Sequence, residues 1–397
     1  MRVLILSKEG HGAGIAHRLS KEGHHVDLWI EDKEYKDTLK GFVERPDSWR
    51  PVAALADLVI SDCAGYNKYA EVFGRLGKPM LGLNPVGDVL DLDYTKFNEA
   101  LNKVGVKTPA FTIFKTPQEA QSLPWEAEAG YVVHTGYNEV KVCETEGLYK
   151  WVLSTLPPKD TVLVTENLKT DNTVMVSIEG WFNGISWIEP FNYTVYTKGA
   201  SITLPMDKIS KLVKATTFRL APLLSRSSYR GPISLKCVVS EGEVYTVGVR
   251  GGFNKKSIES LMTGLTEPIG AFLFDTATGI KKQMSLAKST AGFDFLGSVR
   301  VCSEYDDNGK DMPICGMTDQ DLKFTYFHNV YKDSPCIRFT GADEHIITAT
   351  AFGRSVKEVQ HRINKLTGNI KALDTYYKDN LSPLDRDIEL LKEWSWL

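Results

Sequence analysis

The sequence predicts an α/β protein that begins with a doubly wound parallel sheet and ends with a domain rich in β-strands. Three observations support this prediction. Short apolar runs alternate with helical patterns near the N-terminus, strand-like segments joined by tight turns fill the middle, and short strands followed by an amphipathic helix close the chain. A change from alternating elements to paired strands is typical of several packed domains.

The N-terminal segment carries the alternating pattern. Residues 3–6 form a continuous apolar run, which is typical of a parallel strand buried on both faces. A helical pattern follows from Ile15 to Leu19. Further strands are expected at 26–30, 57–60 and 79–83. This β-α-β order predicts a doubly wound sheet.

A glycine-rich loop separates the first strand from the first helix. Gly10, Gly12 and Gly14 lie where the N-terminus of a helix could hold a phosphate group. The spacing is not a complete G-x-G-x-x-G motif, so it does not indicate a dinucleotide site. A tight turn without a ligand explains the glycines equally well, and the sequence leaves both interpretations open.

Paired strands and single helices follow. Strands are expected at 130–134, 140–144, 162–166 and 174–179, and Asn183-Gly184 predicts a hairpin turn. The next segments are a helix rich in Lys and Arg, a second hairpin and a short helix, expected at 206–224, 231–249 and 258–264. An apolar repeat at Val356, Val359, Ile363 and Leu366 predicts the amphipathic helix near the end of the chain.

Composition limits the class of protein. The chain has 397 residues, of which 42% are hydrophobic and 24% charged, so we expect two to four folded subdomains rather than disorder. The net charge of −3 does not indicate nucleic-acid binding, although it is compatible with a local basic surface. No apolar run is long enough to cross a membrane, and we expect no membrane partner.

The cysteines point to a reducing compartment. Six are present, none in a C-x-x-C pair, so we expect buried free thiols and no zinc site. We therefore expect a cytoplasmic protein, or one in the host cytoplasm if its source is viral.

The order of several short motifs resembles a known family. The motifs are Leu-Gly-Leu-Asn-Pro at 81–85, Tyr-Thr-Lys-Phe at 94–97, Val-Gly-Val-Lys-Thr-Pro at 104–109, Tyr-Arg-Gly at 229–231, Phe-His at 327–328 and Thr-Ala-Thr-Ala-Phe-Gly at 348–353. Together they resemble glycinamide ribonucleotide synthetase, the phosphoribosylamine–glycine ligase, within the ATP-grasp superfamily.

The resemblance implies an ATP-grasp architecture in four parts. The expected parts are an N-terminal α/β domain, a small lid-like subdomain, a central catalytic subdomain and a C-terminal β-rich domain with the final helices, at 1–109, 110–190, 191–290 and 291–397.

Several family positions carry the wrong residues for ATP and magnesium. Thr246 and Gly248 stand where the family has a Glu and an Asn that bind Mg²⁺, an ion that prefers hard oxygen ligands. His134 replaces the phosphate-binding lysine, and the glycine-rich lid is reduced to residues 137–141. We therefore expect no metal site and no cofactor. ATP and Mg²⁺ are expected to bind only if other carboxylates, such as Glu166, Glu241 or Glu243, replace the lost ligands.

The resemblance also suggests site residues. The expected catalytic residues are His134 or Glu166 as a base and Arg250 as a bidentate partner for a carboxylate. The expected substrate-binding residues are Gly10, His11, Gly12, Lys96, Lys141, Asn254 and Lys255. We expect His328, in an aromatic run, to be structural.

Three functions are compatible with these residues. The first is a transferase that joins the amine of a glycine-like amino acid to a phosphate- or pyrophosphate-activated acceptor, such as a hypermodified pyrimidine in DNA, as in phage-type amino acid:DNA transferases. Its partners would be the amino acid and that acceptor. The second is an ATP-dependent carboxylate–amine ligase of the phosphoribosylamine–glycine ligase type. The third is a non-catalytic relative that only binds a ligand.

Overall fold

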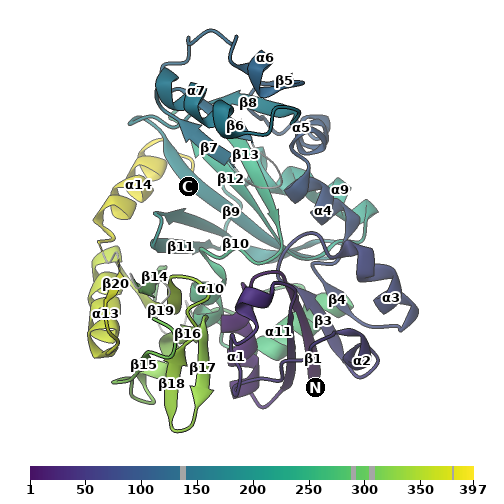
Figure 1. Cartoon of the computed structure of the whole chain (residues 1–397), viewed down its shortest axis with the longest axis vertical. Helices are drawn as coiled ribbons and strands as arrows, with labels where there is room; N and C mark the ends of the chain where they lie inside the picture. Colours follow the sequence, from purple (N-terminus) through teal and green to yellow (C-terminus); the bar gives the residue numbers. More distant parts are fainter. Residues whose placement is uncertain (135–139, 288–291, 304–308, 378–379) are drawn as a thin grey trace.

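The computed structural model describes residues 1–134, 140–287, 292–303, 309–377 and 380–397. Residues 137–139 of the expected lid lie outside this part of the chain. Figure 1 shows a small lobe above a larger body, with the N-terminal domain on one side of the body and the C-terminal helices on the other. Among the described residues, no helix has both the length and the apolar character needed to cross a bilayer.

The N-terminal domain is built on a four-stranded parallel sheet in the order β2-β1-β3-β4. Its strands are β1 (Arg2–Ser7), β2 (His25–Ile30), β3 (Leu58–Ser61) and β4 (Met80–Leu81). Its helices are α1 (Ala13–Lys21), η1 (Lys33–Tyr35), α2 (Arg50–Ala53), η2 (Asn67–Tyr69), α3 (Ala70–Arg75), α4 (Pro85–Leu92) and α5 (Tyr94–Lys103). The predicted parallel sheet is confirmed.

Strand β1 shows why this sheet needs apolar residues on both faces. Val3 and Ile5 pack in a core that includes Phe272 of helix α11 (Ile269–Thr278). Leu4 packs on the opposite side with Phe73 of α3. Because side chains alternate along a strand, a continuous apolar run fills both layers.

The small lobe holds a four-stranded antiparallel sheet in the order β5-β8-β6-β7. Its strands are β5 (Phe111–Phe114), β6 (Tyr131–His134), β7 (Val140–Cys143) and β8 (Val162–Glu166). Helices α6 (Pro117–Ala120) and α7 (Glu146–Thr155) contribute Ala120, Tyr149 and Val152 to its core.

A nine-stranded sheet forms the centre of the molecule. Eight of its strands follow the order β13-β12-β9-β10-β11-β14-β19-β16, and β20 pairs with β14. The strands are β9 (Val174–Asn183), β10 (Trp187–Tyr196), β11 (Ala200–Met206), β12 (Arg230–Val239), β13 (Val244–Gly251), β14 (Phe295–Ser303), β16 (Thr325–Phe327), β19 (His345–Gly353) and β20 (Thr375–Tyr377). A three-stranded sheet pairs β15 (Pro313–Ile314) with β18 (Cys336–Phe339), which also pairs with β17 (Val330–Asp333).

The remaining helices cover this sheet. They are α8 (Lys211–Ala215), η3 (Thr217–Leu220), α9 (Ala221–Arg226), α10 (Ile258–Gly264), η4 (Asp321–Phe324), α13 (Val356–Asn369) and α14 (Ser382–Glu393). The predicted helices at 258–264 and near 356–366 are confirmed as α10 and α13. Both predicted hairpins are also confirmed, and Gly184 takes the positive φ of 97° that the first turn requires.

The sheet pairing differs from the expected division of the chain. The boundary placed at 190 falls inside β10, and β9 belongs to the central sheet rather than to the small lobe. Strands β14 and β19 of the expected C-terminal domain extend the same sheet. Sequence periodicity identifies strands but does not say which strands pair.

Two expectations are corrected. The single helix predicted at 206–224 is divided into α8, η3 and α9, because the Ser210 side chain caps a new helix and Thr216 leaves the helical conformation with a ψ of −104°. The thiols are not all buried: Cys315 is exposed and Cys336 is partly exposed.

Candidate active site

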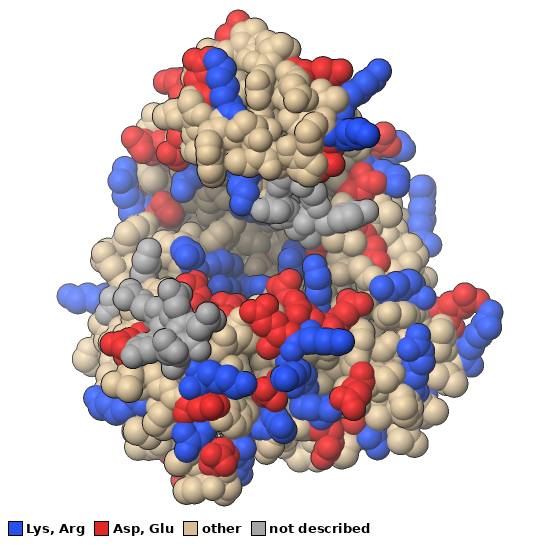
Figure 2. Space-filling model, viewed as in Figure 1, with Lys and Arg blue, Asp and Glu red and all other residues tan. Residues whose placement is uncertain are grey.

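A cavity of about 350 Å³ lies between the small lobe and the central sheet. Figure 2 shows it as a hollow below the upper lobe with Lys and Arg side chains along it. The four cations that line it are Lys236, Arg250, Lys255 and Lys256. Among the described residues, Asp91 is the one carboxylate in its lining, so this first cavity is strongly cationic.

An aromatic wall forms another part of the first cavity. Tyr94 at the start of α5 lies against His134 at the end of β6, with 4.1 Å between ring centroids. Burial, with a smaller contribution from Lys236, lowers the pKa of His134 to about 4. At neutral pH this ring is therefore uncharged, and it offers a flat, weakly polar surface to a ligand.

Arg250 points its guanidinium group between the first cavity and the N-terminal domain. Its Nη2 atom lies 3.4 Å from Nδ1 of His11, and its Nε atom lies 4.0 Å from a carboxylate oxygen of Asp91. That Nε atom is buried and has no hydrogen-bond partner among the described residues. Because a buried donor without a partner is costly, an anionic ligand here would gain from it.

Lys255 and Lys256 occupy the loop after β13. Part of the Lys255 side chain is exposed, but protein atoms surround its ammonium group, and this desolvation, together with Arg250 and Arg300, lowers its pKa to about 8. Burial and the charges of Arg300 and Lys255 lower the pKa of Lys256 to about 7. Its Nζ donates to the backbone oxygens of Thr197 and Lys198, at 2.9 and 2.7 Å. Clustered cations of this kind favour binding of anions.

A second, smaller cavity of about 40 Å³ adjoins the first through Lys255, which lines both. Its charged and titratable residues have both signs: Glu9, His11, Lys255, Glu259, Arg300, His328, Asp343 and His345. A mixture of carboxylates and cations around a small volume suits a zwitterion better than a polyanion.

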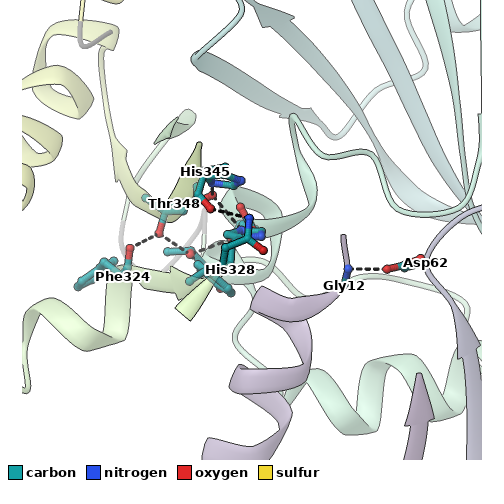
Figure 3. A network of polar contacts seen from close by, with 11 residues as sticks. Gly12, Asp62, Phe324, His328, His345 and Thr348 are labelled. Atoms are coloured by element: carbon teal, nitrogen blue, oxygen red, sulfur yellow. Dashed lines mark hydrogen bonds and ion pairs between the residues drawn. The ribbon is translucent and has the colours of Figure 1, made fainter. Parts of the chain in front are cut away.

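A hydrogen-bonded cluster lies on one side of this second cavity. Nε2 of His328 is 2.5 Å from Oε1 of Glu259 and 3.2 Å from the hydroxyl of Thr348, which lies 3.0 Å from Nε2 of His345 (Figure 3). The two imidazole rings are 3.9 Å apart. Burial is the main cause that lowers the pKa of His345 far below its ordinary value, so His345 is neutral and does not repel its neighbour.

The amides of Gly10 and Gly12 in the glycine loop are already bound to side chains of the protein. The amide of Gly12 donates to Oδ2 of Asp62 at 2.6 Å (Figure 3), and the amide of Gly10 donates to Oγ of Ser7 at 2.8 Å. The loop instead contributes the side chain of His11, whose Nε2 lies 3.1 Å from Glu9. Of the two interpretations left open by the sequence, this geometry favours the tight turn.

The predicted site residues divide into three groups. His134, Arg250, Asn254 and Lys255 line the first cavity, and Gly10 and His11 line the second. Four others line neither cavity. The amide of Gly12 is bound to Asp62, Glu166 is exposed at the end of β8, and Lys141 is exposed on β7. Lys96 is exposed on α5 and forms an ion pair with Asp93 at 2.9 Å.

Several residues that line the cavities were not indicated by any sequence pattern. Asp91, Glu259, Arg300 and His345 lie far apart along the chain and belong to no motif. His328, expected to be structural, lines the second cavity. Only the pairing of β14 with β19 and the packing of α10 on both strands bring Glu259, Arg300 and His345 together.

Comparison with known proteins gives the fold. No family model matches the chain, and no curated protein matches its sequence. Among solved structures, phosphoribosylamine–glycine ligase from Thermotoga maritima is similar, with a TM-score of 0.70, 16% identity and coverage of 96% of this chain and 99% of that one. L-amino acid ligase from Bacillus licheniformis has a TM-score of 0.60 and 13% identity, with coverage of 94% and 98%.

A third similar structure contains a bound nucleotide. Biotin carboxylase from Campylobacter jejuni, a complex with β,γ-ATP, has a TM-score of 0.64 and 12% identity, with coverage of 95% of this chain and 93% of that one. At these identities the likeness establishes architecture rather than activity. The chain has the ATP-grasp fold of the glycinamide ribonucleotide synthetase type.

The residues around the first cavity do not fit the magnesium ion that such a fold implies. Thr246 is fully buried against Cys237 at 3.5 Å, and Gly248 has no side chain. The Asp91 carboxylate already accepts from the amide of Gly251 at 3.1 Å. Among the described residues, no three His, Cys, Asp or Glu side chains are grouped so that they could hold a metal ion. Mg²⁺ needs several oxygen ligands, and this donor set does not supply them.

Proposed function

We propose that the protein transfers a glycine-like amino acid, through its amine, to an acceptor that is already activated by a phosphate or pyrophosphate group. The observation that carries this proposal is the lining of the first cavity, where four cations and one carboxylate lie among the described residues and the donor set does not fit Mg²⁺. Cationic side chains can neutralise a leaving phosphate group without a metal.

The first cavity would hold the activated acceptor. Arg250 is suited to a phosphate group because its planar guanidinium can donate two parallel hydrogen bonds. Lys255 adds a second charge from the same side of the cavity. The neutral ring of His134 and the ring of Tyr94 provide a surface against which a planar base could stack.

The second cavity would hold the amino acid. Arg300 can bind its carboxylate, while Glu9 and Glu259 can accept hydrogen bonds from its ammonium group. With a volume of about 40 Å³, this cavity excludes large side chains, which agrees with glycine. Since Lys255 lines both cavities, the amine and the activated carbon would meet beside it.

A basic groove supports a long polyanionic acceptor such as DNA. It measures about 800 Å³ and lies between α5 and the η3–α9 segment, with Lys96, Lys103, Arg219 and Arg226 in its lining. Phe218, which is 43% exposed, also lines it. Helix α5 contributes Tyr94 to the first cavity and Lys96 to the groove, so one helix could contact both a reacting base and the flanking phosphates.

The ATP-dependent ligase remains the second candidate, because the similar structures include a phosphoribosylamine–glycine ligase and an L-amino acid ligase. It requires a carboxylate that is activated by a nucleotide inside the first cavity. The cations there suit phosphates, whereas the donor set does not fit the accompanying Mg²⁺.

The test is incubation with radiolabelled glycine and DNA that carries a pyrophosphorylated hydroxymethyl-pyrimidine, with and without ATP and Mg²⁺. We expect label in the DNA without ATP and release of pyrophosphate in equal amount. Label that appears only with ATP would instead establish the ligase. No incorporation under either condition, together with no change in melting temperature on adding glycine or pyrophosphate, would overturn both candidates.

A further inference from the structure

The proposed transfer needs a proton acceptor beside the amine, and the two bases expected from the sequence do not lie there. His134 lines the first cavity, and its pKa of about 4 makes it a weak acceptor for a proton from an ammonium group. Glu166 is exposed at the end of β8 and lines neither cavity.

The second cavity contains a histidine that a carboxylate holds in place. Nε2 of His328 lies 2.5 Å from Glu259, and the two side chains are 10% and 5% exposed. His328 also lines the second cavity, so its ring can reach a ligand bound there. A carboxylate on one ring nitrogen fixes the tautomer and leaves the other nitrogen as a proton acceptor.

The surroundings of the pair orient it firmly. The His345 ring lies tilted against the His328 ring, with 3.9 Å between centroids, and the hydroxyl of Thr348 lies within hydrogen-bond distance of both rings (Figure 3). Glu259 belongs to α10, whereas His328 follows β16, so the pair forms only when these two elements are packed. Such a rigid arrangement of base and orienting carboxylate is the usual construction of a general base.

We propose that His328 is the general base of the proposed transfer and that Glu259 positions it. This inference rests on the proposed function. The ammonium group of glycine gives one proton to Nδ1 of His328, and the freed lone pair forms a bond to the activated carbon of the acceptor. The bond from that carbon to the phosphate oxygen breaks, and pyrophosphate leaves with the electron pair. The secondary ammonium product then releases its second proton to solvent, so no oxidant or reductant is required.

Chemical rescue separates this role from a purely structural ion pair. His328→Ala should lower the rate of labelled-glycine transfer to the pyrophosphorylated DNA by about a hundredfold or more. Added imidazole should restore part of that rate, because it can enter the vacated space and accept the proton. The matched control is His361→Ala on the exposed face of α13, which should change neither the rate nor its response to imidazole.

Glu259 is tested by two variants. Glu259→Gln should lower the rate while leaving the affinity for the DNA unchanged, and Glu259→Asp should recover part of the loss. If His328→Ala unfolds, His328→Gln with circular dichroism and melting temperature as readouts replaces it. A correctly folded His328→Gln protein with the wild-type rate would overturn the inference while leaving the transfer intact.

A binding measurement makes failure of the inference distinguishable from failure of the proposed function. Protein labelled with ¹³C at histidine Cε1 is titrated with glycine alone. The His328 signal should shift and saturate, whereas the His361 signal should not move. Absence of that shift would refute the pairing of His328 with the amino acid. Absence of label transfer by the wild-type protein, with the shift present, would refute the proposed function and not the site.

Discussion

Arg250 lines the first cavity and contacts two side chains of the N-terminal domain. It is held only loosely, by His11 at 3.4 Å and Asp91 at 4.0 Å, and its buried Nε atom has no hydrogen-bond partner among the described residues. An arginine whose guanidinium group is not fully hydrogen-bonded can change its conformation at little cost in free energy to bind an anion. This separates Arg250 from an arginine that merely stabilises the fold.

Replacing Arg250 tests the anion site without knowledge of the acceptor. Arg250→Met should weaken binding of inorganic pyrophosphate, measured by isothermal titration calorimetry without Mg²⁺, by about 10- to 100-fold, as expected for loss of a charge-assisted bidentate contact. Arg386→Met on the exposed face of α14 is the control and should bind normally. Equal affinity in both variants would contradict the assignment of Arg250.

Glu179 makes a different kind of prediction, because it is a fully buried carboxyl group. It accepts hydrogen bonds from Ser257 at 2.9 Å and Trp181 at 3.1 Å, and burial raises its pKa from an ordinary 4.5 to about 7. Between these pH values the folded protein binds more protons at Glu179 than the unfolded chain does. Stability therefore falls as the pH rises from about 4.5 to 7 and loses nothing further above that range.

The Glu179→Gln variant should remove this pH dependence. We expect it to be more stable than wild type at pH 8, by up to about 3 kcal/mol, and to gain little at pH 5. Urea unfolding at both pH values measures the difference. The same gain at pH 5 and pH 8 would show that Glu179 does not titrate in this range.

Individual helices and strands depend on local signals, such as caps and apolar spacing, that can be read directly from the sequence. Helix α13 begins after Ser355, whose side chain accepts from the amide of Glu358, and its buried residues Val359, Ile363 and Leu366 have helical spacing. The segment 206–224 shows the opposite case. Its residues form helices in short pieces, because the Ser210 cap and the turn at Thr216 interrupt a pattern that reads as continuous.

The cap of α13 provides a test at this scale. Ser355→Ala should destabilise the protein by about 1 kcal/mol, since the amide of Glu358 loses its partner at the helix terminus. Urea unfolding is the measurement, and Ser154→Ala, an exposed position in α7, serves as the control. A loss no larger than that of the control would indicate that water replaces the cap without cost.

At the scale of the whole molecule, the central sheet joins parts of the chain that the sequence presents as separate domains. Strands β9–β13 continue through β14 into β19 and β16, so strands taken from the whole range 174–353 share one hydrogen-bonded sheet. The second cavity lies where α10 and this sheet meet the N-terminal loop that carries His11. We therefore expect this assembly to unfold cooperatively.

Thiol reactivity measures that cooperativity. Cys315 and Cys336 are at least partly exposed and should react quickly with a thiol reagent under native conditions. The other four thiols are buried in the N-terminal domain, the small lobe and the central sheet, at Cys63, Cys143, Cys237 and Cys302. Burial raises the pKa of each of these four, which lowers their reactivity further.

Cooperative unfolding should release Cys63, Cys237 and Cys302 together at one urea concentration, with Cys143 of the small lobe free to react earlier. Mass spectrometry after pulsed alkylation identifies each thiol. Release of Cys302 well before Cys237 would show that the sheet separates between its two halves.

The sequence alone determined the elements and the architecture they belong to, because periodicity, caps and turn residues act over a few neighbouring positions. Of the four cations that line the first cavity, the sequence singled out Arg250 and Lys255, which lie in one strand and the loop after it, but not Lys236 or Lys256. The set of residues that line the second cavity was determined only by the tertiary structure. Glu259, Arg300 and His345 come together only through strand pairing and helix packing across distant segments, and no short-range pattern records those contacts.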